Sequence, residues 1–165
     1  MTANRGRGSL SLCGGPDTQS LTRERRVQRI MSLRQSIYLR WKGIDHGVRA
    51  EEDPALLERL AAEQIPLTVC PLSNVNLGVF ARLEEHNIAR LLRRGIAVSL
   101  HSDDPPYFGG YLSHCFKETS AALDLSAAEV VEMNKNAIRA AFLDRDTKQR
   151  LLAASESHFE RWTTP

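Results

Sequence analysis

The chain has 165 residues, enough for one domain with a buried core, and its 42% hydrophobic and 25% charged residues are ordinary for a globular protein. The net charge of +2 argues neither for nor against a nucleic-acid partner. No apolar run approaches the roughly 20 residues of a membrane span or forms the core of a secretory signal. The odd number of cysteines (Cys13, Cys70 and Cys115) and the lack of CxxC spacing argue against a disulfide framework, so we expect a cytoplasmic protein without membrane contact.

The first 42 residues differ from the rest in charge. They hold nine Lys or Arg and two Asp or Glu, a balance of +7, which leaves −5 for residues 43–165. Residues 1–20 are rich in Gly, Ser, Thr and Asn and are predicted to be disordered, whereas residues 21–42 can form a basic helix. We therefore predict a basic leader, disordered or divergent, over residues 1–42, followed by a folded region over residues 43–165.

Short apolar segments then alternate with amphipathic ones. A strand is expected to end near Ile44, and two more are expected at residues 67–70 and 96–100. The helix between the first two strands begins at Asp53-Pro54, because Asp caps a helix and Pro suits its first position. Pro66 ends it. The next helix is expected over residues 83–94, with Gly95 as its C-terminal cap.

Two further helices are expected after the third strand. Ser126 and Glu129 match a capping box, which predicts a helix whose apolar face continues to Phe142. A last helix is expected from about Thr147 to Trp162. Strands that alternate with amphipathic helices indicate parallel βαβ units, so the expected fold class is α/β.

A polar pair follows each expected strand: Asp45-His46, Ser73-Asn74 and Asp103-Asp104. Each pair alone is typical of a turn, a loop or a helix cap. Together they are expected to converge, because the carboxyl ends of parallel strands lie at one edge of a sheet. Of two adjacent Asp residues, one can ligate a metal while the other binds substrate, and a nearby His can orient a metal-activated water. The H-x-E and P-C-x-x-C signature of the cytidine-deaminase type is absent.

Three segments in this order resemble one family. Residues 43–49 (GIDHGVR), 68–74 (TVCPLSN) and 99–110 (SLHSDDPPYFGG) resemble the R-I-(G/D)-H-G-x-R, C-P-x-S-N and (S/T)-(L/V)-N-(S/T)-D-D-P segments of the zinc-dependent adenosine/adenine deaminases, which are amidohydrolases. Leu72 and the run Tyr107-Phe108-Gly109-Gly110 are closer to the adenine deaminase branch. The resemblance covers residues 43–162.

The resemblance implies a (β/α)8 TIM barrel, of which this chain would hold the C-terminal strands and helices. It implies hydrolytic deamination of a 6-aminopurine, adenine favoured over adenosine, with zinc as cofactor and release of ammonia. By the same resemblance, Asp103 would be a zinc ligand, Asp104 would bind the purine ring, and His46 would be catalytic by orienting the attacking water. Ser73 and Asn74 would support the pocket.

Two motifs of the family have no counterpart in the chain. The His-x-His pair and the His-Ala-Gly-Glu segment, which supply further zinc ligands and a proton-transferring Glu, are missing, and the family's Asn two residues before Asp103 is His101. Catalytic zinc usually has three protein ligands, so one Asp leaves the site incomplete. Three of eight strands also leave open sheet edges. We therefore expect a truncated deaminase-like hydrolase, weakly active or inactive alone and prone to self-association.

Two other functions stay open. In the first, the chain completes its active site with a second chain and deaminates purines only in that complex. In the second, it is a non-catalytic binding fragment whose basic arm contacts nucleic acid. The charge step at residue 42 is the only feature that favours the binding fragment, and a nucleic-acid contact is not expected because no aromatic residues alternate with the basic ones.

Overall fold

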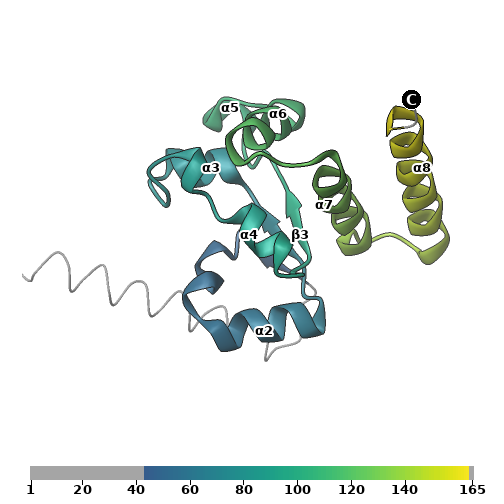
Figure 1. Cartoon of the computed structure of the whole chain (residues 1–165), viewed down its shortest axis with the longest axis horizontal. Helices are drawn as coiled ribbons and strands as arrows, with labels where there is room; N and C mark the ends of the chain where they lie inside the picture. The colour runs from purple at the N-terminus through teal and green to yellow at the C-terminus, as the bar shows by residue number, and fades with distance from the viewer. Residues whose placement is uncertain (1–42, 164–165) are drawn as a thin grey trace, which may run out of the picture.

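The computed structural model describes residues 43–163 (Figure 1). The predicted disordered segment (1–20) and the predicted basic helix (21–42) both lie outside the described residues. Among the described residues, Cys70 and Cys115 are buried and form no disulfide. No helix in this part of the chain is both long enough and apolar enough to cross a membrane.

Three short parallel strands form the centre of the molecule. They are β1 (Ile44–Asp45), β2 (Leu67–Val69) and β3 (Val98–Leu100), and they pair in the order β1-β2-β3. In register, Ile44 lies opposite Leu67, and Leu67 lies opposite Val98. The predicted parallel βαβ arrangement is therefore confirmed for these strands.

The connection from β1 to β2 contains the 3-10 helix η1 (Val48–Glu52) and the helix α2 (Pro54–Glu63). The Asp53 carboxylate accepts a hydrogen bond from the Leu56 amide at 3.3 Å, and Pro54 occupies the first turn, as predicted. Leu56, Leu57 and Leu60 are buried and belong to the hydrophobic core cluster.

The connection from β2 to β3 differs from the prediction in two places. Residues Pro71–Asn76 form a helix, α3, for which no helix was predicted. The prediction of a single helix over residues 83–94 is wrong, because the segment is interrupted at His86. The chain forms the 3-10 helix η2 (Leu83–Glu85), has an extended backbone at His86 and then forms α4 (Ile88–Arg93). Two buried side chains explain the break, because His86 accepts the Ile88 amide at 3.1 Å and Asn87 donates to the Val48 carbonyl at 2.8 Å.

Four helices follow β3. Two of them, α5 (Pro105–Phe108) and α6 (Leu112–Leu123), were not predicted. The helix α7 (Ala127–Ala140) begins with the predicted capping box, and α8 (Arg145–Thr163) matches the predicted last helix within two residues. The prediction that Phe142 lies on an apolar helix face is wrong, since α7 ends at Ala140 and the Phe142 side chain is 89% exposed.

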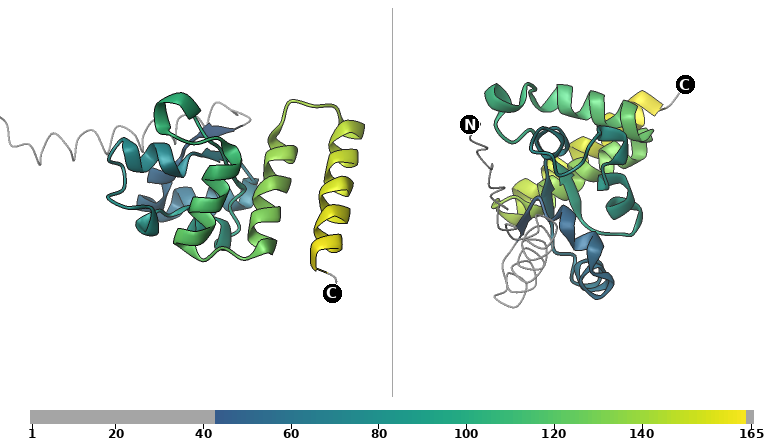
Figure 2. Two further views of the ribbon diagram at one scale, coloured as in Figure 1. Left: turned by 90° about the horizontal axis from the view of Figure 1, so that it is seen from above. Right: turned by 90° about the vertical axis from the view of Figure 1, so that its left-hand side faces the viewer.

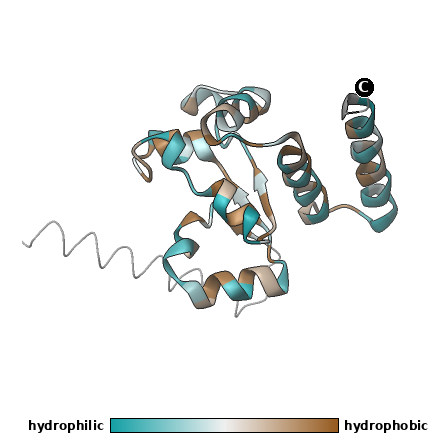
Figure 3. Ribbon diagram, viewed as in Figure 1, coloured by the Kyte–Doolittle hydropathy of each residue, from teal (hydrophilic) through white to brown (hydrophobic). Residues whose placement is uncertain are grey.

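The core lies around β2 and β3, and its fully buried members come from all parts of the described chain: Leu60, Leu67, Val69, Ile88, Leu91, Ile96, Val98 and Met133. Helix α7 packs against β3 and α8 packs against α7, so α8 stands apart from the sheet (Figure 2). Most of α8 is hydrophilic, with apolar residues in between (Figure 3).

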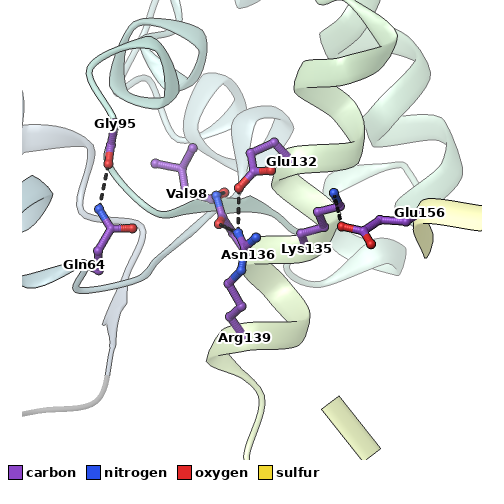
Figure 4. Close-up of polar contacts among 8 residues, drawn as sticks. All are labelled: Gln64, Gly95, Val98, Glu132, Lys135, Asn136, Arg139 and Glu156. Carbon is purple, nitrogen blue, oxygen red and sulfur yellow. Dashed lines mark hydrogen bonds and ion pairs between the residues drawn. The ribbon is translucent and has the colours of Figure 1, made fainter. Parts of the chain in front are cut away.

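Polar side chains fasten α7 to its neighbours (Figure 4). Asn136 donates to the Val98 carbonyl at 3.0 Å and accepts from Arg139 at 2.8 Å. Lys135 pairs with Glu156 of α8 at 2.8 Å. Because Ala97 and His101 bond to β2, the Val98 carbonyl points to the outer edge of β3, and Asn136 satisfies it there.

Candidate functional site

Three side chains with metal-binding atoms meet at the carboxyl end of the sheet. His46 directly follows β1, Cys70 directly follows β2 and Asp103 lies just beyond β3. One ligand atom of each residue lies within 4.8 Å of the others. The structure therefore brings two of the predicted site residues together, and it adds Cys70, which sequence reasoning did not single out as a site residue.

Both predicted residues have a left-handed backbone. The φ angle is 56° at His46 and 62° at Asp103. The other two residues with positive φ among the described non-glycine residues, Gln64 and Asp124, are ordinary helix C-caps. The left-handed conformation is unfavourable for most L-residues, and residues that adopt it are enriched at functional sites. Its occurrence at these two strand ends is therefore consistent with a functional site.

The Asp103 carboxylate is held from two sides. The Ser73 hydroxyl, on the buried side of α3, donates to its Oδ2 at 2.6 Å. The Nε2 atom of His46 lies 3.9 Å from the same oxygen. The side chains of His46 and Asp103 are 38% and 32% exposed, so solvent or a ligand can reach them. A short hydrogen bond to the carboxylate orients it toward His46.

Asn74 connects His46 to the interior. Its amide nitrogen lies 3.4 Å from His46 Nδ1, and its amide oxygen lies 3.1 Å from His86 Nε2. Asn74 and His86 are 3% and 1% exposed. Burial lowers the pKa of His86 to about 4, so this imidazole is neutral near pH 7. Sequence reasoning assigned His86 no role, and no motif marks it, because its partner is twelve residues away in the chain.

The Cys70 thiol keeps its proton when no metal ion is bound. Burial, assisted by the nearby Asp103 charge, raises its pKa to about 12. Thiolate, and not thiol, binds metals. Cys70 would therefore have to lose its proton in order to ligate a metal beside Asp103.

The predicted residue Asp104 and the neighbouring His101 both follow β3 in the chain. Asp104 occupies the N-cap position of α5, but its exposed carboxylate makes no capping hydrogen bond. His101 Nε2 lies 2.8 Å from the Ser99 hydroxyl, and burial lowers the pKa of this imidazole. Among the described residues, His101 is not part of the cluster of metal-binding atoms.

These residues do not make a zinc site by themselves. A catalytic zinc usually takes three protein ligands at about 2.0–2.3 Å. Asp103 offers one carboxylate oxygen, Cys70 would first have to lose its proton, and the contact of His46 Nδ1 with Asn74 leaves only the Nε2 of this imidazole. The described part of the chain thus contains one well-placed ligand and a neighbouring imidazole, and a complete site needs further ligands.

Two hollows among the described residues lie away from this edge. One, of about 560 Å³, is lined by Gln64, Pro66, Ala97 and the end of α7, at the opposite end of the strands. The other, of about 670 Å³, lies between α7 and α8. His46, Asp103 and Asp104 line neither of them.

Comparison with known proteins shows a consistent similarity. The family model described as adenosine deaminase matches residues 31–156, and thus begins within the basic segment. An adenine deaminase of Acinetobacter baylyi is 55% identical over 106 residues, which cover 64% of this chain and 32% of that protein. An adenine deaminase of Hahella chejuensis is 49% identical over 122 residues, which cover 74% of this chain and 36% of that protein. The chain spans about a third of the length of these relatives.

Solved structures agree with the sequence matches. The crystal structure of an adenine deaminase from Arthrobacter aurescens aligns with a TM-score of 0.71 and 40% identity, over 72% of this chain and 36% of that one. An amidohydrolase from Burkholderia ambifaria with bound Zn aligns with a TM-score of 0.70 over 76% of this chain and 35% of that one, at 24% identity, which supports the fold alone. The predicted fold, part of a (β/α)8 barrel with C-terminal helices, is confirmed.

Proposed function

Because the chain belongs to the adenosine deaminase family, we propose that it supplies the C-terminal part of an adenine deaminase active site. In this proposal Asp103 is one ligand of a zinc ion whose other ligands lie outside these 165 residues. Asp104 binds a ring nitrogen of the purine, and His46 orients the attacking water. The reaction replaces the exocyclic amine with oxygen and releases ammonia.

One observation supports this proposal most strongly. The motifs that contain His46, Ser73 and Asp103 lie far apart in the sequence, yet their side chains meet within hydrogen-bonding or near-contact distance at one end of the sheet. The exposed Asp104 follows Asp103 directly and leaves room for a ligand at its carboxylate. The choice of adenine over adenosine is supported by the identity to adenine deaminases, which reaches 55%.

The 165-residue polypeptide alone is proposed to have little or no activity, since its described residues provide too few zinc ligands. A second polypeptide that carries the missing ligands would restore the site. The unpaired thiols of Cys70 and Cys115 are compatible with the cytoplasmic location that we also propose.

The experiment mixes the chain with the N-terminal two thirds of the Acinetobacter baylyi adenine deaminase, in the presence of zinc. We expect adenine absorbance to fall and ammonia to appear in the mixture, and neither to occur with either polypeptide alone. Asp103→Ala, Asp104→Asn and His46→Ala should each abolish the activity of the mixture. Asp146→Asn, a similar charge loss on the exposed surface of α8, is the matched control and should leave it intact.

Two results would contradict the proposal. Adenine turnover by the chain alone would show that the site is complete without a partner. A stable complex of the two polypeptides that binds zinc but deaminates neither adenine nor adenosine would show that the assembled site serves another reaction.

A further inference from the structure

A chain of hydrogen bonds runs from the backbone of α4 to the site, and its direction can be determined from one end. The Ile88 amide is 3.1 Å from His86 Nδ1. A backbone N–H can only donate, so His86 Nδ1 must be the acceptor and carry no proton. Since the buried His86 is neutral, its proton is on Nε2.

The hydrogen bonds of Asn74 can then be assigned a donor and an acceptor. His86 Nε2–H donates to the Asn74 amide oxygen at 3.1 Å, which assigns the two ends of this amide. The amide nitrogen of Asn74 therefore faces His46 and donates to its Nδ1 at 3.4 Å. An imidazole whose Nδ1 accepts a hydrogen bond carries its proton on Nε2 when it is neutral.

We propose that His86 and Asn74 are positioning residues that hold neutral His46 in the Nε2–H tautomer. The network thereby directs an N–H donor, and not a lone pair, toward the side of the site where Asp103 lies. Its use in catalysis rests on the proposed function, whereas the tautomer itself does not.

This tautomer separates the roles of His46 and Asp103. A ring nitrogen that carries a proton cannot ligate a metal, so His46 stays a hydrogen-bond donor although its Nε2 lies 3.9 Å from Asp103 Oδ2. In a deaminase site, such a donor can hold the oxygen of the attacking water and stabilise negative charge that develops on it. Asp103 remains the metal-facing ligand.

The first test is the tautomer of His46 in the full, unmodified chain, measured by long-range proton–nitrogen NMR correlations at about pH 8. The His46 signals are assigned by comparison with the His46→Gln variant. We expect a protonated Nε2 and an unprotonated Nδ1. A predominant Nδ1–H form, or an equal mixture of the two forms, would overturn the proposal. The NMR measurement needs neither zinc nor purine.

A pair of variants tests whether His86 sets this tautomer. Gln and Met have similar size and shape, and both remove the ring contact of His86 with Phe80, but only Gln can donate to Asn74. His86→Gln should retain the Nε2–H form of His46. His86→Met should let the Asn74 amide turn and give a mixture of tautomers. The same tautomer ratio in the folded forms of both variants would refute the role of His86.

A second pair tests Asn74. Asp at this position has only acceptor atoms, so Asn74→Asp should draw a proton to Nδ1 and switch His46 to the opposite tautomer. Asn76→Asp places the same charge two residues further on, at an exposed position of α3, and should leave the tautomer unchanged. An unswitched tautomer in a folded Asn74→Asp variant would contradict the relay.

Discussion

At the scale of single residues, the site combines backbone strain with buried polar contacts. His46 and Asp103 both have positive φ, and the hydroxyl of Ser73 and the amide of Asn74 hold their side chains. These contacts stabilise a backbone that most residues would avoid. Two substitutions of Asp103 can distinguish the effect of its backbone conformation on stability from the effect of its charge.

Asp103→Asn should leave the free energy of unfolding unchanged within about 1 kcal/mol, because Asn tolerates left-handed backbone and can accept the Ser73 hydrogen bond. Asp103→Val should lower it by about 1–2 kcal/mol more, since a β-branched residue is disfavoured at this φ. Urea unfolding of both variants measures this difference. Equal stabilities would mean that the position is not strained.

The buried His86 predicts a pH dependence of stability. Its pKa is about 4 in the folded chain and near the ordinary value of about 6.5 when unfolded, so between these values the unfolded state binds the extra proton. The contribution of neutral His86 is therefore complete above about pH 6.5 and is lost as the pH falls toward 4, by up to about 3 kcal/mol.

The measurement is urea unfolding of the wild-type chain and of His86→Gln between about pH 8 and pH 4. The wild type should lose more stability on acidification than the variant, because only the wild type carries this buried imidazole. Glu51 and Glu129, whose pKa values are lowered by Arg90 and Arg93, destabilise both proteins alike at low pH. Parallel curves would contradict a buried neutral His86.

At the scale of elements, the features that were predicted correctly are those set by residues close together in the sequence, such as helix caps and turns. The Asp53 cap, the capping box of Ser126 and Glu129, and the turn at Gly95 are all present as expected. The break at His86 was not predictable, since a helical pattern runs through it and only buried tertiary hydrogen bonds interrupt it. The end of α7 before Phe142 was likewise missed, because the apolar pattern continues past the helix.

The hydrogen bond between Asn136 of α7 and the outer edge of β3 leads to a prediction about stability. Asn136→Ala removes the donor that satisfies the Val98 carbonyl, which should lower the free energy of unfolding by about 1–3 kcal/mol. Asn134→Ala is the matched control at an exposed position of α7 and should change the free energy of unfolding by less than about 0.5 kcal/mol. Thermal or urea unfolding compares the two. A similar small effect in both would show that Asn136 does not fasten α7 to the sheet.

At the scale of the whole molecule, the parallel pairing of three strands and the incompleteness of the zinc site were predictable from the sequence, whereas the full set of side chains that meet there was not. Alternating strands and helices predict parallel pairing, and parallel pairing predicts that His46 and Asp103 share one edge. The participation of Cys70 and the relay through His86 depend on how α3 and α4 pack, which no local pattern specifies.

Within residues 43–163, the three-stranded sheet has two outer strands, whereas a closed barrel has none. We therefore predict that the isolated chain self-associates with increasing concentration, as measured by sedimentation velocity. Addition of the N-terminal polypeptide described above should suppress this association by covering the same edges. A monomer at all concentrations would contradict the prediction.

The most direct test of the central claim is equilibrium dialysis of the isolated chain against zinc, followed by metal analysis. If the chain holds only part of the site, it should bind much less than one zinc per chain at micromolar zinc, and Asp103→Ala should change this little. One tightly bound zinc per chain that disappears in Asp103→Ala would show that these 165 residues already form a complete metal site.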